Sequence, residues 1–396
     1  MSKQPTAIIM GGSLGGLNAA LYLRAAGFSV TVLERSIEPL AGQGAGIVLN
    51  PYTVRYLTES AALDVADISI SSSYVRYIDD NSQIIAELES PYRFASYNSI
   101  YAGLLTLFGR ENYHLNQRVT GFNQRGDSVR VHTDQGFHAN CDLLVCADGI
   151  GSEARRWLLG NTPAAYAGYI AWRGIISTAD IPPAAFALLQ NAIVYHITPC
   201  EHLLTYPIPL VENSLTERHR CINWLWYRNV AAGESLDSLM TDGEGNVRQR
   251  SVAPGAVRDE AIAAMKVEAA AVPALLQELI VATERPFIQA IFDYEIPQMA
   301  FGRVCIMGDA AFSARPHTAA GTAKAAEDAR QLGLALRTCH NDVPAALKLW
   351  EDRQLQLGRN LVQRNREAGT LLQNGGWPIG APLSFGLYEE GDSQMH

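Results

Sequence analysis

A glycine-rich turn near the N-terminus constrains the fold of this chain more than any other feature. An apolar run over residues 7–10 leads into Gly11-Gly12-Ser13-Leu14-Gly15-Gly16, and residues 17–26 follow with helical periodicity. A second apolar run, over residues 28–33, is rich in β-branched side chains and ends at Glu34. This order predicts a strand, a tight turn, a helix and a parallel strand, the opening unit of a Rossmann-like α/β domain.

The same turn has the chemistry of a dinucleotide site. Glycines let the backbone approach a pyrophosphate, whose charge is stabilised by the N–H groups and the dipole at the start of the helix. Glu34 lies about 20 positions beyond the turn, the spacing of a carboxylate that accepts hydrogen bonds from a ribose. Ser13 stands where a middle glycine is usual, and its N–H can still reach a phosphate. We predict dinucleotide binding, and the alternative is a glycine-rich turn without a ligand.

Composition narrows the class of protein. A chain of 396 residues has room for about two domains, and its net charge of −9 argues against a nucleic-acid partner. The six cysteines form no C-x-x-C pair, which predicts buried thiols in a reducing cytoplasm and no metal site. We find no secretory signal and no run of about 20 apolar residues, so we expect neither export nor a membrane partner.

Two further segments place polar residues at the ends of apolar strands. Residues 141–146 lead into Asp148-Gly149, and a helix that carries Arg155 follows. Residues 302–307 lead into Gly308-Asp309, and a loop then reaches a helix over residues 322–338. Each segment is therefore predicted to be a buried strand that ends in a turn with an aspartate and is followed by a helix.

In this order, over residues 7 to about 335, the three segments resemble the fingerprints of the single-component FAD-dependent aromatic hydroxylases, the group that includes para-hydroxybenzoate hydroxylase. The resemblance implies an enzyme that binds FAD, consumes NADH or NADPH and O₂, and hydroxylates a small aromatic ring through a flavin C4a-hydroperoxide. Four short strings resemble most the members that act on hydroxypyridines such as 2,6-dihydroxypyridine: residues 97–101, 167–174, 206–209 and 315–317.

The resemblance also implies which residues bind FAD. Asp309 is expected to contact a ribityl hydroxyl and Glu34 the adenosine ribose. Family members often place an arginine against the pyrophosphate where this chain has Tyr101, so Arg35 or Arg118 is expected to assist. The expected cofactor-binding residues are Gly11, Ser13, Leu14, Gly16, Glu34, Arg35, Arg118, Val119, Asp148, Gly149, Arg155, Gly308, Asp309, Ala319, Ala320, Gly321 and Thr322.

Two of these carboxylates have a plainer interpretation. Asp148 and Asp309 could simply cap the turns that follow their strands. If they do bind ligands, Asp148 and Arg155 are implied to serve both FAD and the approach of NAD(P)H. No second glycine-rich nucleotide turn is present, so the nicotinamide cofactor is expected to bind only transiently.

The middle of the chain is rich in aromatic strands. The runs 169–176, 193–198, 202–208 and 221–227 predict an antiparallel sheet on which a planar substrate could pack, although core packing alone would give the same pattern. We expect Trp172, Tyr195 and Trp224 to contact substrate. His196 and Tyr206 are candidate general bases, and Pro316 and His317 lie in the expected flavin loop, completing the predicted catalytic set.

We therefore predict an α/β protein with a discontinuous Rossmann-like FAD-binding domain, a substrate domain with an antiparallel sheet, and a C-terminal helix with a tail. The boundaries are 1–75, 98–167 and 285–340 for the first, 76–97 and 168–284 for the second, and 341–396 for the last. The resemblance implies a homodimer. The alternatives are the same chemistry on a phenolic, urate-like or polyketide ring, and, more remotely, a flavin halogenase or an FAD-binding sensor without turnover.

Overall fold

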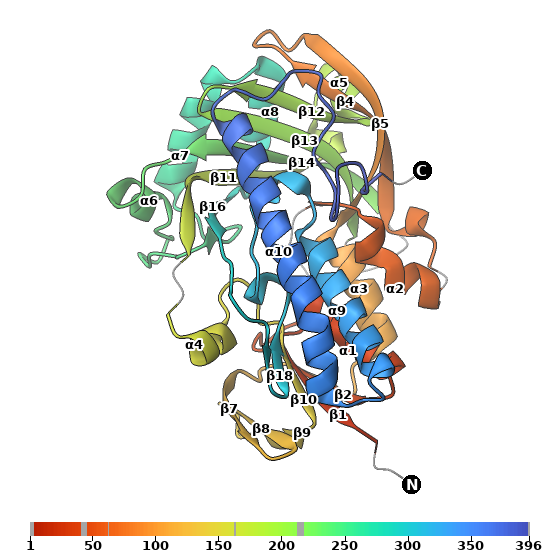
Figure 1. The fold of residues 1–396 in the computed structure, drawn as a ribbon. Coiled ribbons are helices and arrows are strands. Elements are labelled where there is room, and N and C mark those ends of the chain that lie inside the picture. The colour runs from red at the N-terminus through yellow and green to blue at the C-terminus, as the bar shows by residue number, and fades with distance from the viewer. Residues whose placement is uncertain (1–3, 41–45, 62, 162–163, 212–217, 395–396) are drawn as a thin grey trace.

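The computed structural model describes residues 4–40, 46–61, 63–161, 164–211 and 218–394, and within them two large sheets lie one above the other (Figure 1). The lower sheet has the order β17-β18-β10-β1-β2-β6 and is parallel except for the β17–β18 pair. Its strands are β1 (Thr6–Met10), β2 (Ser29–Leu33), β6 (Tyr113–His114), β10 (Leu143–Cys146), β17 (Ala300–Phe301) and β18 (Val304–Ile306). The predicted strand, turn, helix and strand at the N-terminus is confirmed.

Helices cover the lower sheet and enclose the largest apolar core. They are α1 (Leu14–Ala25), α2 (Pro51–Ala61), α3 (Tyr97–Phe108) and α9 (Gly321–Thr338). A much longer helix, α10 (Val343–Gln373), packs on α9 and runs up to the second sheet (Figure 1). Asp342 caps its start, because the Asp342 side chain accepts a hydrogen bond from the Ala345 N–H at 3.2 Å.

The upper sheet has the order β15-β16-β11-β14-β13-β12-β4-β5-β3, and its pairs are antiparallel except β12–β4. Its strands are β3 (Gly46–Val48), β4 (Ser69–Ile78), β5 (Ile84–Ser96), β11 (Ala165–Ser177), β12 (Ala192–Thr198), β13 (Glu201–Val211), β14 (Arg218–Asn229), β15 (Ser251–Val252) and β16 (Phe287–Asp293). The α/β class and the antiparallel second sheet are therefore confirmed.

The two faces of the upper sheet have different neighbours because side chains alternate along each strand. One face, the helix-covered face, packs against α5 (Pro183–Leu189), α7 (Asp259–Glu268) and α8 (Ala274–Ala282). The other, the inner face, packs against α10, the C-terminal tail and Ala319 of the loop before α9. Which side chains point to the inner face decides which can meet a ligand bound at that loop.

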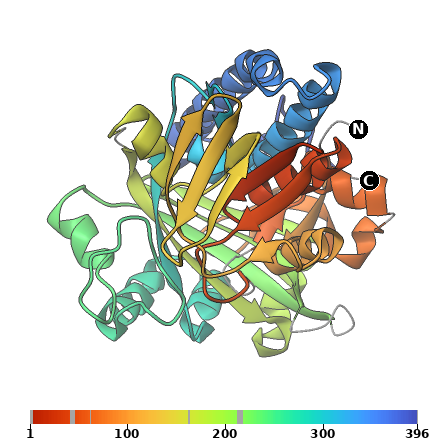
Figure 2. The same cartoon turned by 90° about the horizontal axis from the view of Figure 1, so that it is seen from below.

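The remaining elements lie around the two sheets. A three-stranded antiparallel sheet crosses the lower end of the molecule (Figure 2). This sheet is formed by β7 (Val119–Arg125), β8 (Ser128–Thr133) and β9 (His138–Cys141). Two further helices, α4 (Glu153–Leu159) and α6 (Glu234–Leu239), are short. Single 3₁₀ turns occupy Val65–Asp67, Thr178–Asp180, Ala269–Ala271, Gly308–Ala310 and Pro316–Thr318.

One sequence expectation needs correction. Not all thiols are buried: Cys200 is exposed and Cys339 is partly exposed. The division into domains stays a prediction, although its boundary at residue 75 falls inside β4, and β3 and β16 pair within the upper sheet.

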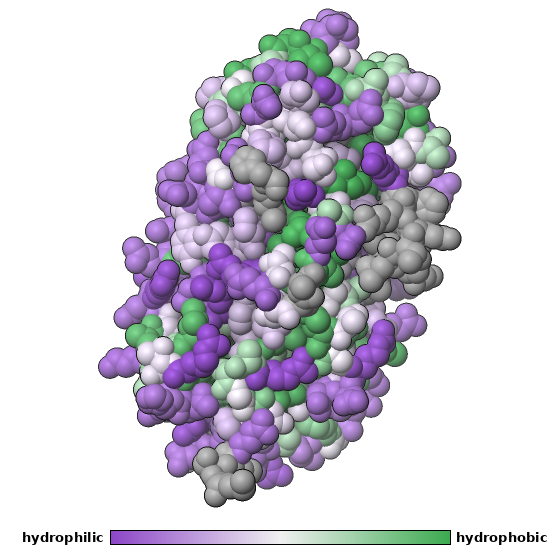
Figure 3. Space-filling model, turned by 90° about the vertical axis from the view of Figure 1, so that its right-hand side faces the viewer, coloured by the Kyte–Doolittle hydropathy of each residue, from purple (hydrophilic) through white to green (hydrophobic). Residues whose placement is uncertain are grey.

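Among the described residues, no helix is both long and apolar enough to cross a bilayer. On the face drawn in Figure 3, hydrophilic residues are interspersed with small hydrophobic groups.

Candidate active site

Two positions of the glycine turn leave no room for a Cβ atom. Gly11 has a φ of 101°, and a Cβ there would lie 2.4 Å from the carbonyl oxygen of Ala147, the residue that follows β10. A Cβ on Gly16 would lie 1.8 Å from the carbonyl oxygen of Gly11. The turn therefore needs glycine at both positions, and its backbone remains open to a close-lying ligand.

Polar groups around this turn are already partly engaged. Glu34 is buried at the end of β2, where one carboxylate oxygen accepts from the Gly12 N–H at 2.7 Å and the other from the Ser36 N–H at 2.9 Å. Ser13 precedes α1, and its side chain does not cap the helix but bonds the Tyr97 hydroxyl at 2.7 Å. The N–H groups of the first turn of α1, which includes the buried Leu14, thus have no side-chain acceptor there.

The two arginines expected to assist the pyrophosphate are both on the surface. Arg35 is exposed, and the exposed Arg118 forms an ion pair with Glu153 of α4. Val119, next to Arg118, is buried. Tyr101, which occupies the usual arginine position, is buried with its hydroxyl 3.1 Å from that of Tyr113. Tyr113 packs against the glycine turn, and its hydroxyl donates a hydrogen bond to the Gly12 carbonyl at 2.9 Å. The sequence alone did not single out this residue.

The polar side chains of the Asp-Gly segment, Asp148 and Arg155, form hydrogen bonds within the protein. Asp148 accepts hydrogen bonds from the Ser152 hydroxyl at 2.6 Å and from the Glu153 N–H at 2.7 Å, so it caps the start of α4. Arg155 is buried and donates to the carbonyls of Ala310 and Ile150, each at 2.7 Å. Arg155 therefore ties the Asp-Gly segment, in which Gly149 has a φ of 76°, to the Gly-Asp segment.

Asp309 differs from Asp148 because it makes no hydrogen bond within the part of the chain that the structure describes. It follows Gly308, which has a φ of 61°, and it has exposed surface. Protein atoms nonetheless surround its carboxyl group, and this burial raises the pKa of Asp309 to about 6, opposed by Lys324 and assisted by Asp328. Lys324 and Asp328 are themselves buried and paired at 2.6 Å beneath the Gly308 N–H.

These features fit FAD. The glycine turn offers backbone N–H groups to a pyrophosphate, and Asp309 offers an unengaged carboxylate to a hydroxyl-bearing chain. Ala320 begins α9 without a side-chain cap, so the N–H groups of Gly321 and Thr322 can stabilise negative charge on a flavin pyrimidine ring. The side chain of Thr322 lies 3.3 Å from the Thr53 hydroxyl.

The loop before α9, residues 315–320, is held from two sides. Asn365 of α10 accepts from the Thr318 N–H at 3.0 Å and donates to the Thr318 hydroxyl at 2.8 Å. Gly386 of the tail donates to the Thr318 carbonyl at 2.9 Å. Pro316 is exposed, and Ala319 has a left-handed φ of 53°, so this loop has one fixed and strained shape.

His317 points away from the exposed side of that loop into a cluster of rings. Its Nε2 lies 2.7 Å from the Tyr169 hydroxyl, and its ring centroid is 5.5 Å from His202 and 5.4 Å from Tyr227. Burial lowers the pKa of His317 well below its usual range, with His202 and Arg315 acting in the same direction. His317 is therefore a neutral imidazole that anchors the loop to the inner face.

Tyr206 and Tyr195 lie on the inner face, as a substrate wall requires. Tyr206 stacks on Phe94 at 4.8 Å and donates to the Gly46 carbonyl at 2.9 Å, and burial raises its pKa to about 12, opposed by Arg173. Tyr195 stacks on Tyr77 at 5.8 Å. The role of either residue toward a substrate stays a prediction.

Three other expected residues point the opposite way. Trp172 and Trp224 belong to the helix-covered face, where the Trp224 indole donates to Thr283 at 2.8 Å. His196 shares this direction, being one position from Tyr195, and its Nε2 lies 2.9 Å from Asp80. The proposed substrate contacts of both tryptophans and the general-base role of His196 are therefore corrected to packing roles, because alternation sends their side chains away from the inner face.

The inner face instead presents polar residues that the sequence reading missed. His202 lies four positions before Tyr206 on β13, stacks on Tyr227 at 4.5 Å and shares a 3.1 Å hydrogen bond with Gln373. Arg173 and Asn223 lie on the same face of β11 and β14. The two-residue period from Tyr206 back to His202 was a signal that could have found the histidine.

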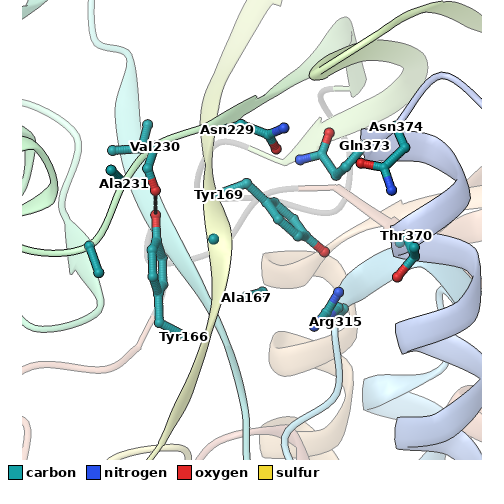
Figure 4. Close-up of a pocket in the computed structure, with 13 residues that line it drawn as sticks. Tyr166, Ala167, Tyr169, Asn229, Val230, Ala231, Arg315, Thr370, Gln373 and Asn374 are labelled. Carbon is teal, nitrogen blue, oxygen red and sulfur yellow. Dashed lines mark hydrogen bonds between the residues drawn. The ribbon is translucent and has the colours of Figure 1, made fainter.

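A cavity of about 580 Å³ opens beside this ring cluster (Figure 4). Tyr166 and Tyr169 of β11 form one wall, and Thr370, Gln373 and Asn374 at the end of α10 form the other (Figure 4). Arg315 closes it on the side of the loop before α9. The cavity thus reaches Tyr169, whose hydroxyl is hydrogen-bonded to His317.

Comparisons with known proteins agree with this geometry. Residues 166–293 match a family described as FAD binding domain-like. The 2,6-dihydroxypyridine 3-monooxygenase of Paenarthrobacter nicotinovorans is 37% identical over 96% of this chain and 95% of its own length. The solved 2,6-dihydroxypyridine-3-hydroxylase of Arthrobacter nicotinovorans superposes with a TM-score of 0.92, at 36% identity and 98% coverage of both chains. A Klebsiella pneumoniae protein solved with FAD and uric acid shares the fold, with a TM-score of 0.76, 24% identity and coverage of 93% and 89%.

Proposed function

We propose that the substrate of this protein is a hydroxypyridine such as 2,6-dihydroxypyridine. The chain belongs to the single-component FAD-dependent aromatic monooxygenases. The 37% identity to a hydroxylase of that compound over nearly the whole chain is the observation that carries this proposal. Bound FAD supplies the redox chemistry, because it accepts a hydride from NADH or NADPH and activates O₂ for transfer of one oxygen atom to the ring.

The protein's own residues bind, orient and stabilise. We assign the pyrophosphate to the N–H groups of the turn from Gly11 to Gly16, and a ribityl hydroxyl to Asp309. The start of α9, at Gly321, stabilises negative charge on the reduced flavin. These assignments follow from the tight glycine turn, the unengaged carboxylate and the uncapped helix.

The inner face of the upper sheet forms the substrate wall in this proposal. Tyr206 presents a neutral ring there because burial raises its pKa to about 12. His202 is neutral as well, since burial lowers its pKa to about 3. Packed aromatic rings keep water from the reacting atoms, which an oxygen-transferring enzyme needs if it is to couple reduction to hydroxylation.

Measuring NADH and NADPH oxidation by the FAD-loaded protein tests the proposal. 2,6-Dihydroxypyridine, other hydroxypyridines, simple phenols and uric acid are added one at a time, and products are identified by mass. We expect a hydroxypyridine to accelerate oxidation most and to gain one oxygen atom. Faster turnover of a phenol or of uric acid would contradict the proposed substrate and leave the monooxygenase chemistry intact.

The resemblance also leads us to propose a cytoplasmic homodimer. Light scattering on the eluted protein should give twice the chain mass of 43.1 kDa. A mass of one chain at micromolar concentration would contradict the dimer.

A further inference from the structure

Arg173 is a cation on the inner face of the upper sheet. It lies on β11 opposite Leu225 of β14, two residues beyond Ala171, and Ala319 of the loop before α9 packs against the same face. Its Nη1 donates to the Gln289 side-chain oxygen at 2.9 Å, and its guanidinium lies 5.4 Å from the centre of the Phe287 ring. Neutral neighbours therefore hold the Arg173 side chain in place.

Arg173 has no counter-ion among the residues that the structure describes. Within the described ranges, no carboxylate lies at ion-pair distance from it, and its buried Nε has no acceptor. Arg315, by contrast, is neutralised by Asp293 at 3.2 Å. Arg173 is partly exposed, so a ligand can reach its guanidinium. A cation set into an apolar face without an anion is unfavourable unless a ligand supplies the negative charge.

Asn223 adds a second unmet donor to the same face. It is fully buried on β14, two residues from Leu225 and directly opposite Tyr206 of β13. Its side-chain oxygen accepts from the Gly46 N–H at 3.5 Å, while its Nδ2 has no acceptor among the described residues. Arg173 lies opposite Leu225, so Arg173 and Asn223 are diagonal neighbours on adjacent strands. Diagonal neighbours lie about 7–8 Å apart, a distance that long side chains and a small ring can bridge.

All of these unmet groups are donors, so the complementary ligand presents an acceptor with negative charge. We propose that Arg173 is the counter-ion of a ring oxyanion on the substrate, and that Asn223 donates a second hydrogen bond to it. This inference rests on the proposed function, in which the substrate is a hydroxypyridine. The ring hydroxyl gives up its proton to solvent on binding, and the resulting anion is the electron-rich ring that accepts oxygen.

Substrate binding to the FAD-loaded protein tests this assignment, followed through the flavin absorbance from pH 5 to 9. In Arg173→Met the dissociation constant of 2,6-dihydroxypyridine should rise by at least about 30-fold, the lower end for removing one partner of a buried charged pair. The apparent pKa of the bound ring hydroxyl should also rise by about one unit or more, while Arg173→Lys restores part of both. Asn223→Leu should weaken binding by about 10-fold.

Thr205→Val is the matched control. Thr205 neighbours Tyr206 on β13, and its buried hydroxyl likewise has no partner in the described part of the chain, but it points to the opposite face. This variant should bind substrate as the wild type does. The FAD content of every variant is measured as well, because loss of flavin would indicate a role in folding or in cofactor binding.

Unchanged substrate affinity in Arg173→Met, together with a lower flavin reduction potential, would overturn the proposal and assign Arg173 to the flavin. If Arg173→Met does not fold, Arg173→Lys and Asn223→Leu give the same comparison. The proposed substrate can fail independently: if the wild type hydroxylates a phenol instead, the same titrations with that phenol test the oxyanion site. Equal binding of the phenolate by wild type and Arg173→Met would then reject it.

Discussion

At the scale of single residues, two aspartates that each follow a strand of the lower sheet have different environments. Asp148 is fully used in capping α4, so its structural interpretation is the stronger one. Asp309 follows its strand in the same way, but it is exposed and its carboxylate is not engaged by the described residues. A carboxylate free of local partners is the one that a ligand can use, so the two motifs are not equivalent.

We expect Asp309→Ala to fold and to retain much less FAD than the wild type, because the ribityl chain loses its acceptor. The ratio of flavin to protein absorbance after gel filtration measures this directly. Asp148→Ala serves as the comparison, since it should lower thermal stability, by about 1 kcal/mol for a lost cap, more than flavin content. Full flavin occupancy in Asp309→Ala would show the assignment to be wrong.

His202 gives a pH-dependent prediction. Burial lowers its pKa to about 3, so in acid the unfolded chain takes up a proton that the folded chain does not. Its contribution to stability is complete above pH 6.5 and is lost as the pH falls from 6.5 toward 3. Relative to wild type, His202→Phe should therefore gain roughly 2 kcal/mol between pH 7.5 and pH 5. Urea unfolding at the two pH values measures the gain.

The control for that experiment is His138→Phe, which removes an exposed histidine of β9. Phenylalanine at position 202 keeps the stacking on Tyr227 while removing the titrating group. Equal acid sensitivity of His202→Phe and the wild type would mean that the imidazole is accessible to water in the folded protein.

At the scale of elements, α10 shapes the loop that precedes α9. Asn365 fixes Thr318, and one turn further on Gly369 leaves room for the His317 ring. A Cβ on Gly369 would lie 2.8 Å from the His317 Cδ2 and 3.0 Å from the Tyr169 hydroxyl. The long helix is thus a template against which the loop is held.

The variant Gly369→Ala distinguishes the effect of this close contact on stability from the effect of helix propensity. Propensity alone would make alanine stabilising by about 1 kcal/mol in a helix interior. We expect a net loss of about 1–3 kcal/mol instead, because the added methyl displaces a buried ring. Thermal unfolding and flavin fluorescence report on the helix and the loop, and Glu367→Ala on the exposed side of α10 is the control. A stabilised Gly369→Ala would refute the close contact.

At the scale of the whole molecule, the C-terminal tail joins parts that are distant in sequence. Arg364 of α10 donates to the carbonyls of Ser384, Gly386 and Leu387, each at 3.2 Å. The Asn50 side chain reaches Ser393 at 2.7 Å, and the Tyr388 hydroxyl reaches Glu327 at 2.9 Å. The tail therefore packs on its own chain, spanning the start of α2, α9 and the loop that it bonds at Thr318.

We expect Arg364→Met to release the tail, since three carbonyl acceptors lose their charged donor at once. Limited proteolysis should then cut within residues 384–394 at least ten times faster, on the order expected for losing 1.4 kcal/mol or more of local stability. Arg359→Met, which replaces an exposed arginine of the same helix, is the control. Unchanged cleavage would indicate that apolar contacts alone hold the tail.

The sequence by itself determined the Rossmann-like unit, the Gly-Asp segment and the long last helix. These features depend on local rules: residue periodicity, glycine turns and caps act within a few residues of chain, so a single sequence carries them. The resemblance of three motifs in order added the family and the cofactor.

Only the tertiary structure decided which side of each strand faces the loop before α9. Trp172 and Arg173 are neighbours in sequence, yet one packs under helices and the other lies on the inner face. Both faces of the upper sheet are apolar, so alternation divided the side chains into two sets without saying which set faces the loop before α9. That choice depended on where α8 and α10 pack, which are contacts between residues distant in the sequence. It moved the candidate site from His196 to His202, Arg173 and Asn223.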